Sequence, residues 1–205
     1  MVLHLLATMV PEKTSALDRQ KHIKYWKRAS MLMPDAFTPL DSNRMSLGYF
    51  MVVALDLLNA LDVIELAEQE SWIEWVYSCQ VDTGGFRGSS SMSLGEARNQ
   101  ENRYWEPATV PGTFFALCIL LVLGDDLARV KREKLLSWLA KLQRPDGTIG
   151  EFLFQNDKIE GGLDLRICLC GTAVAWMLQD NTGGASKPVF DVERMKKYIM
   201  SCQVC

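Results

Sequence analysis

The sequence predicts an all-α protein with the architecture of an α/α toroid, and three observations support that prediction. Apolar residues recur at helical spacing along the chain, whereas Val, Ile and Thr nowhere form the alternating pattern of a strand. Apolar helices alternate with amphipathic ones, which indicates an inner and an outer layer of helices. A pattern also recurs about every 60 residues with two helices in each copy, which is typical of an α/α toroid or of an α-solenoid.

The internal repeat is marked by a glutamine at the end of each amphipathic helix. The first two copies, Gln80 and Gln143, are each followed four residues later by a glycine, Gly84 and Gly147, and the third copy is Gln203. The glutamines are 63 and 60 residues apart, and an aromatic residue precedes each of them by a few positions. A closed ring of this kind usually needs about five or six repeats, so the three visible copies predict an incomplete ring.

The helical periodicity predicts seven helices, at residues 12–33, 42–61, 65–79, 110–123, 126–142, 164–178 and 192–202. The apolar stretches 45–61, 113–123 and 167–178 are predicted to face the concave inner side. The amphipathic helices between them are then predicted to form the outer layer.

Local signals account for the connection into the second helix. Pro34 and Pro39 are expected to keep this connection non-helical, because proline lacks a backbone donor and restricts the residue before it. Asp41 or Ser42 is predicted to cap the helix by accepting a hydrogen bond from an unpaired N–H of its first turn.

Proline and glycine also mark the later helix ends. Pro111 falls in the first turn of the fourth helix, where its missing N–H has no helical partner to lose. Gly84, Gly85 and Gly147 follow helix ends and are predicted to supply left-handed turns. The first of these turns, GGFRGSS, lacks the Lys-Ser/Thr pair of a phosphate-binding loop, which argues against a phosphate cradle.

Composition and charge exclude several classes of protein. The chain has 205 residues, of which 48% are hydrophobic and 23% charged, as in ordinary globular proteins. A net charge of −3 argues against nucleic-acid binding through phosphate contacts. The longest apolar run, residues 114–123, is shorter than the roughly 20 residues of a membrane span, so no span is expected.

The first ten residues are apolar, but they have neither a basic stretch nor a small-residue cleavage site. A signal peptide is therefore not favoured, and we expect a cytoplasmic protein. Residues 1–20 are expected to form a poorly ordered N-terminal extension, and residues 21–205 to form the N-terminal part of the barrel.

The cysteines do not form a recognisable metal site. Cys202 and Cys205 form a single CxxC pair, but there is no second pair to complete a zinc-finger ligand set, and His4 and His22 are the only histidines of the sequence. A zinc-finger type of site is therefore excluded, and buried free thiols in a reducing compartment are the simpler interpretation. The cysteines are Cys79, Cys118, Cys168, Cys170, Cys202 and Cys205.

Five segments, in this order and spacing, resemble the β subunits of protein geranylgeranyltransferase type I. They lie within residues 21–205 and read HIKYWKRA, LDSNRMSLGYFMVVALDLL, GGFRGSS, LVLGDDLARV and LDLRICLCGTAVAWML. The resemblance implies an α/α barrel and an enzyme that transfers geranylgeranyl from its diphosphate to the cysteine of a C-terminal CaaX sequence. Its expected protein substrates are small GTPases of the Rho, Rac and Rap type that end in leucine, and its expected partner is a prenyltransferase α subunit.

The resemblance also implies a zinc cofactor that activates the thiolate. The family's zinc ligands, an aspartate, a cysteine and a histidine, come from later repeats than those visible in this chain. We therefore predict no metal ligand and no catalytic residue among these 205 residues, and expect the chain alone to be inactive.

Four residues are predicted to contact the lipid. The position of Ser46 carries tryptophan in the farnesyl-specific relatives, so a serine there, with Phe50 one turn on, implies room for a longer lipid. Phe114 and Leu169 stand where the family has tyrosines, and they are predicted to line the same cavity. A small residue at a helix contact remains the alternative interpretation of Ser46.

Two residues are predicted to contact the CaaX peptide. The resemblance implies that Arg166 lies near the peptide, where its guanidinium would bind a carboxylate directly or through water. The alternative is an ion pair with Asp164, Asp157 or Glu160. Thr109 occupies the position of a peptide-site histidine.

Two other functions remain open from the residues alone. The chain could belong to a farnesyltransferase β subunit, which a tryptophan at position 46 would have favoured, or to a non-catalytic α-solenoid that only binds partners. Arg87, in the GGFRGSS turn, is predicted to be structural or to contact the α subunit.

Overall fold

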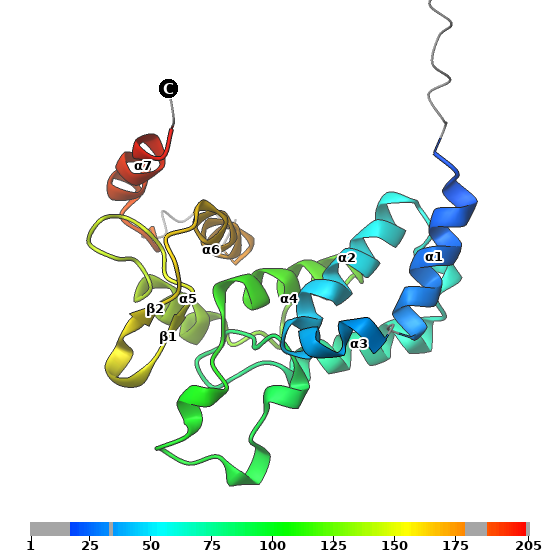
Figure 1. Ribbon diagram of the computed structural model, residues 1–205, viewed down its shortest axis with the longest axis horizontal. Helices are drawn as coiled ribbons and strands as arrows, with labels where there is room; N and C mark the ends of the chain where they lie inside the picture. Colours follow the sequence, from blue (N-terminus) through cyan, green and yellow to red (C-terminus); the bar gives the residue numbers. More distant parts are fainter. Residues whose placement is uncertain (1–16, 33–34, 179–187, 204–205) are drawn as a thin grey trace, which may run out of the picture.

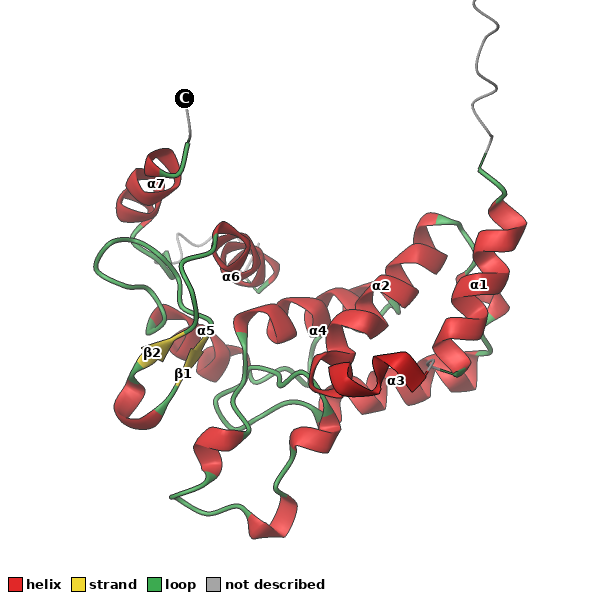
Figure 2. Ribbon diagram, viewed as in Figure 1, coloured by secondary structure: helices red, strands yellow, loops and turns green. Residues whose placement is uncertain are grey.

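The computed structural model describes residues 17–32, 35–178 and 188–203. Seven α-helices and one short hairpin form these parts of the chain (Figures 1 and 2). Their bounds are α1 Arg19–Met31, α2 Arg44–Leu57, α3 Leu66–Ser78, α4 Val110–Val122, α5 Arg132–Ala140, β1 Phe152–Leu153, β2 Ile159–Glu160, α6 Leu165–Met177 and α7 Val192–Ser201. The seven predicted helices are confirmed, and helix α1 begins just inside the predicted N-terminal extension.

Helix α5 begins at Arg132 rather than near Asp126, and α1 begins at Arg19 rather than at residue 12, although residues 12–16 lie outside the described residues. The backbone of Leu127 has a φ of 60°, which breaks a right-handed helix. This turn is held by the Asp125 carboxylate, whose Oδ1 accepts a hydrogen bond from the Leu127 N–H at 2.7 Å.

The connection into α2 also differs from the prediction. Residues 35–43 form a 3₁₀ helix with Pro39 inside it, so the expectation of a non-helical connection is wrong there, and Pro34 lies outside the described residues. A proline φ suits the 3₁₀ conformation. The predicted cap is wrong as well, because Asn43 takes the N-cap position without a side-chain bond, and Asp41 instead contacts Ser91 and Arg44.

The helices form two layers that curve in an arc from α1 to α7 (Figure 1). Helix α4 packs between α2 and α6, which confirms the three predicted inner helices. Helix α3 packs against α4, and α5 packs against α6. The main core lies between the layers and includes Leu117, Leu120, Leu135, Leu139 and Ile149, all fully buried.

The internal repeat predicted from the glutamines is visible in the backbone. Gln80 pairs with Phe86 and Gln143 with Ile149 in isolated β-bridges of identical spacing. Gly84 and Gly147 have φ values of 92° and 94°, which confirms the two left-handed turns. Each turn therefore closes one outer helix and leads toward the next inner one.

The small hairpin β1–β2 was not predicted from the sequence. Phe152 pairs with Glu160, and Leu153 with Ile159, in antiparallel register. The tight turn between the strands places Asn156 and Asp157 at φ values of 56° and 57°, a conformation that Asn and Asp tolerate.

In the part of the chain that the structure describes, no helix is long and apolar enough to cross a membrane.

Candidate functional site

In the described part of the chain, each inner helix carries a stripe of side chains that includes large exposed apolar residues. On α2 this stripe contains Ser46, Phe50 and Leu57, whose spacings of four and seven residues place them on one face. The opposite face of α2, with Met45, Val52 and Leu55, is buried. Phe50 and Leu57 are 54% and 78% exposed, so this face presents apolar surface to solvent.

Helices α4 and α6 carry equivalent stripes. Phe114 is half-buried on α4, and Leu121, seven residues on, is 44% exposed. On α6, Leu169 and Trp176 are 65% and 72% exposed and are also seven residues apart. The predicted lipid residues Ser46, Phe50, Phe114 and Leu169 all fall on these three stripes.

An aromatic cluster joins the stripes of α2 and α4. The ring centroids of Tyr49 and Phe115 lie 4.8 Å apart, those of Tyr49 and Phe114 lie 6.0 Å apart, and those of Phe50 and Phe115 lie 6.1 Å apart. Such tilted contacts fix ring orientation as well as burying area. Burial raises the pKa of the nearby Cys118 thiol to about 11, which keeps this thiol protonated near neutral pH.

Ser46 lies in the first turn of α2. Its hydroxyl donates a hydrogen bond to the carbonyl oxygen of Asn43 at 2.8 Å, so its polar group is satisfied locally. The residue is half-buried. A serine side chain is small and covers little of the adjacent surface of α2. The predicted role of Ser46 in leaving room for a longer lipid stays a prediction.

Thr109 is the N-cap residue of α4. Its Oγ1 accepts a hydrogen bond from the Gly112 N–H at 3.1 Å, and its own N–H donates to the Phe86 carbonyl at 3.1 Å. Thr109 therefore links the GGFRGSS turn to the start of α4. A contact with a peptide stays a prediction.

Arg166 lies at the start of α6, and its side chain is 87% exposed. Its Nη2 lies 2.6 Å from Asp164 Oδ2, which is one of the ion pairs left open by the sequence. Hydrogen bonds from the Arg166 side chain and N–H hold the pKa of Asp164 below its usual value. The structure therefore contains the predicted ion pair with Asp164, and binding of a peptide carboxylate stays a prediction.

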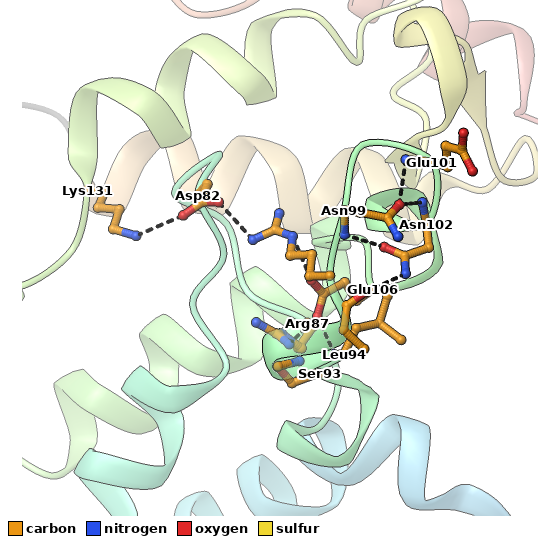
Figure 3. Close-up of polar contacts among 12 residues, drawn as sticks. Asp82, Arg87, Ser93, Leu94, Asn99, Glu101, Asn102, Glu106 and Lys131 are labelled. Carbon is orange, nitrogen blue, oxygen red and sulfur yellow. Dashed lines mark hydrogen bonds and ion pairs between the residues drawn. The ribbon is translucent and has the colours of Figure 1, made fainter.

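A long connection between α3 and α4 forms a loop at residues 89–105, which we call the rim loop. It is closed at its base by a buried ion pair between Arg87 and Glu106, whose Nη1 and Oε2 atoms are 2.7 Å apart (Figure 3). The two side chains are only 7% and 1% exposed. Of the two roles predicted for Arg87, burial supports the structural one.

Glu106 binds the loop at two further points. Its Oε2 accepts a hydrogen bond from the Leu94 N–H at 3.0 Å, and its Oε1 lies 2.8 Å from Arg98 Nε. Arg98 also pairs with Asp82 at 2.7 Å (Figure 3). Sequence reasoning missed Glu106, because a single glutamate before a proline in an aperiodic loop gives no signal of burial.

The described residues do not provide a zinc site. Among them, no three His, Cys, Asp or Glu side chains lie close enough together to hold a metal ion.

Most of the chain is similar to known proteins. Residues 17–205 match the family described as prenyltransferase alpha-alpha toroid domain. The chain is 31% identical over 208 residues to the geranylgeranyl transferase type-1 subunit beta of Dictyostelium discoideum, covering 92% of this chain and 55% of that protein. The corresponding subunit of Arabidopsis thaliana is 28% identical over 197 residues, covering 91% and 48%. Farnesyltransferase β subunits match at 24% identity.

A solved structure described as Candida albicans protein geranylgeranyltransferase-I complexed with GGPP has the same fold. It superposes with a TM-score of 0.74 at 21% identity, covering 90% of this chain and 51% of that one. The chain spans about half the length of the curated relatives that it matches.

Proposed function

The chain belongs to the prenyltransferase alpha-alpha toroid family, and from that premise we propose that it supplies the N-terminal part of a protein geranylgeranyltransferase type I β subunit. The complete enzyme would transfer a geranylgeranyl group from its diphosphate to the cysteine of a CaaX sequence. Its protein substrates would be small GTPases that end in leucine.

One observation supports this function above the others: each of the three inner helices exposes large apolar side chains along one face. Phe50, Phe114, Leu169 and Trp176 lie on these faces, and three of them are more than half exposed. A 20-carbon isoprenoid has almost no polar atoms apart from its diphosphate, so it gains binding energy chiefly by covering apolar surface. These helices would form part of the wall of the lipid cavity.

Two residues at helix starts would bind the other substrate, the CaaX peptide. Thr109 and Arg166 lie at the starts of α4 and α6, and the family resemblance implies that both would contact the peptide. Arg166 would exchange part of its contact with Asp164 for a peptide carboxylate, directly or through water. The zinc that activates the thiolate in this family would be held by later repeats, and an α subunit would complete the heterodimer.

Two alternatives make different predictions. A farnesyltransferase β subunit would prefer the 15-carbon lipid, and both Ser46 and the lower identity of the farnesyl relatives speak against it. A non-catalytic α-solenoid would bind partners without transferring lipid, and the 31% identity to a geranylgeranyl transferase type-1 β subunit over 92% of this chain speaks against it.

The test uses the longest natural chain that contains these residues, co-expressed with a prenyltransferase α subunit. We expect geranylgeranyl transfer to a Leu-ending CaaX peptide, with a preference over farnesyl of at least tenfold in kcat/KM. A preference for farnesyl would support the first alternative, and a stable complex without transfer would support the second.

A matched pair of variants tests the apolar face. Leu169→Asp introduces a charge on the inner stripe, and it should weaken binding of geranylgeranyl diphosphate by about tenfold or more, because a charge is poorly solvated beside a lipid. Leu66→Asp makes the same change on outer helix α3, where Leu66 is 76% exposed, and should leave lipid binding unchanged. Equal effects of both variants would contradict the placement of the lipid.

A further inference from the structure

We infer that Glu106 is a positioning residue for the protein substrate: it closes the rim loop and thereby fixes the start of α4, where Thr109 lies. This inference rests on the proposed function. It concerns the peptide side of the site rather than the lipid side, and neither the sequence pattern nor the family resemblance pointed to Glu106.

The first argument is that one carboxylate holds the loop at its beginning, middle and end. Glu106 directly follows the loop, Arg87 precedes it, and Leu94 and Arg98 lie within it. The three contacts are 2.7, 2.8 and 3.0 Å long, and they use both oxygens of Glu106. Charge-assisted contacts in a buried setting are the stronger kind of hydrogen bond, so this cluster rigidly defines the base of the loop.

The second argument is that the base of the loop is bonded to two of the three helix starts that carry predicted substrate residues. The carbonyl of Phe86, next to Arg87, accepts the Thr109 N–H at 3.1 Å. The carbonyl of Gly88 accepts the Met45 N–H, next to Ser46, at 2.7 Å. A displacement of Arg87 therefore reaches the start of α4 directly.

The third argument concerns what happens when the carboxylate is lost. Arg87 is buried, and its Nε already lacks a hydrogen-bond partner among the described residues. Without Glu106 its charge would have no counter-ion in contact, so the side chain must move or admit water. Arg98 differs, because its side chain is 32% exposed and keeps Asp82 as a second partner. Loss of the Glu106 carboxylate should therefore affect the start of α4 mainly by displacing Arg87.

These contacts predict that loss of Glu106 weakens binding of the peptide more than binding of the lipid. Thr109 is three residues after Glu106 and is bonded to Phe86, which is adjacent to Arg87, whereas Ser46 is connected to the loop base only through Gly88 and Met45. The rest of the lipid stripes continue along α2, α4 and α6. A shift at the start of α4 should weaken peptide binding while the lipid wall keeps its shape. A residue with a merely structural role would instead lower the amount of folded enzyme and leave both KM values unchanged.

The experiment compares Glu106→Gln with Glu101→Gln in the complete natural chain, in complex with its α subunit. Glu101 lies in the same loop with an exposed side chain, so the second variant is a matched control. For Glu106→Gln we expect the KM for a CaaX peptide to rise at least tenfold, with kcat and the KM for geranylgeranyl diphosphate within about twofold. Glu101→Gln should change none of the three values more than about twofold.

A second variant and a second measurement cover the case in which Glu106→Gln folds poorly. Arg98→Gln keeps the Arg87–Glu106 pair, so it should fold and show a smaller rise in the peptide KM. Hydrogen exchange at the Phe86 and Thr109 amides should be faster in Arg98→Gln than in Glu101→Gln, and this readout does not depend on activity.

The outcomes separate the two proposals. A wild-type complex that transfers no lipid refutes the proposed function. An active wild type with Glu106→Gln and Arg98→Gln variants that behave like Glu101→Gln, or that raise both KM values equally, refutes the inference alone.

Discussion

Gly84 lies against the backbone of Lys131, so closely that a Cβ on Gly84 would be 2.7 Å from the Lys131 carbonyl oxygen and 2.6 Å from the Leu135 nitrogen. The turn that closes one outer helix thus packs directly on the next outer helix, α5. Gly147 repeats this relationship, with its turn packed on Arg194 of α7. The repeat is therefore a repeat of tertiary contacts as well as of sequence.

Substitution of Gly84 by alanine should destabilise the chain through two separate effects. Its φ of 92° is strained for alanine by about 1–2 kcal/mol, and the clash with α5 adds about 1–3 kcal/mol. We expect the free energy of unfolding to fall by about 2–5 kcal/mol in urea denaturation.

Gly124→Ala is the control for the backbone effect. Gly124 has a φ of 82°, but apart from its chain neighbours no atom of the described residues lies within 4 Å of the position that an added Cβ would take, so only the strain of about 1–2 kcal/mol should appear. Equal losses for Gly84→Ala and Gly124→Ala would mean that packing on α5 contributes nothing.

Ionisation of Tyr77 should lower the free energy of unfolding at alkaline pH. Its hydroxyl donates to Asp125 Oδ1 at 2.6 Å, and Arg129 lies 4.0 Å from the centre of its ring. Burial, and then the bond to Asp125, raise the pKa of Tyr77 above its usual value. The folded state thus favours the neutral phenol, so this contribution is full below the unfolded pKa of about 10 and is lost as the pH rises above it.

We therefore expect the wild type to lose more free energy of unfolding between pH 9 and 11 than Tyr77→Phe, which cannot ionise. At pH 7 the variant should be less stable by about 1 kcal/mol, the usual value of one hydrogen bond. Urea denaturation at several pH values measures both effects. Parallel pH profiles for the two proteins would contradict the assigned cause.

Helix positions and layers could be predicted because they depend on spacings within about 20 residues. The apolar period places α2, α4 and α6 in the sequence to within a few residues, and the alternation of apolar and amphipathic helices assigns the layers. The predicted cap at Asp41 failed for a different reason. Its carboxylate contacts Ser91, 50 residues along the chain, and no local rule anticipates that partner.

The exposed stripes of the inner helices could be predicted from the same periodicity, whereas the rim loop could not. The assignment of Ser46, Phe50, Phe114 and Leu169 to a lipid site came from the family resemblance and stays a prediction, although all four fall on these stripes. Arg87 and Glu106 are 19 residues apart across an aperiodic loop, and their pairing depends on a fold that brings the ends of the loop together. Burial of a charged pair is a tertiary property of this kind.

Ser46→Trp, in the complete natural chain with its α subunit, should favour farnesyl over geranylgeranyl diphosphate. The indole would project from the first turn of α2 into the lipid cavity and exclude the fourth isoprene unit. Overpacking costs about 1–3 kcal/mol, or about 5- to 150-fold in relative affinity. Competition between the two diphosphates measures this change.

Leu57→Trp is the matched control for the lipid-length prediction. Leu57 lies on the same stripe, but it is eleven residues further along α2, roughly 16 Å away at the helical rise of about 1.5 Å per residue. It should leave the preference between the two lipids unchanged. If Ser46→Trp behaves in the same way, Ser46 does not line the end of the lipid.

Arg166→Ala, in the same complex, should impair the CaaX peptide more than the lipid diphosphate. The guanidinium is largely exposed and its contact is Asp164, two residues away, so its removal should change the melting temperature little. Loss of one charge-assisted hydrogen bond to the peptide corresponds to roughly 10- to 150-fold in kcat/KM for peptide, and less if a water molecule intervenes. Binding of geranylgeranyl diphosphate should stay within about twofold.

Two further variants distinguish a peptide contact from a helix-capping role of the Arg166–Asp164 pair. Arg166→Lys keeps the charge but loses the planar fork, so it should restore peptide use only in part. Asp164→Ala removes the carboxylate that caps α6 through the Arg166 N–H at 2.8 Å, while it leaves the guanidinium free for the peptide.

A capping role predicts that Asp164→Ala lowers the melting temperature more than Arg166→Ala, with peptide and lipid affected alike in both. A peptide role predicts a peptide-selective defect in Arg166→Ala alone, because only that variant removes the group that meets the carboxylate. Peptide and lipid titrations beside thermal unfolding of the three variants decide between these outcomes.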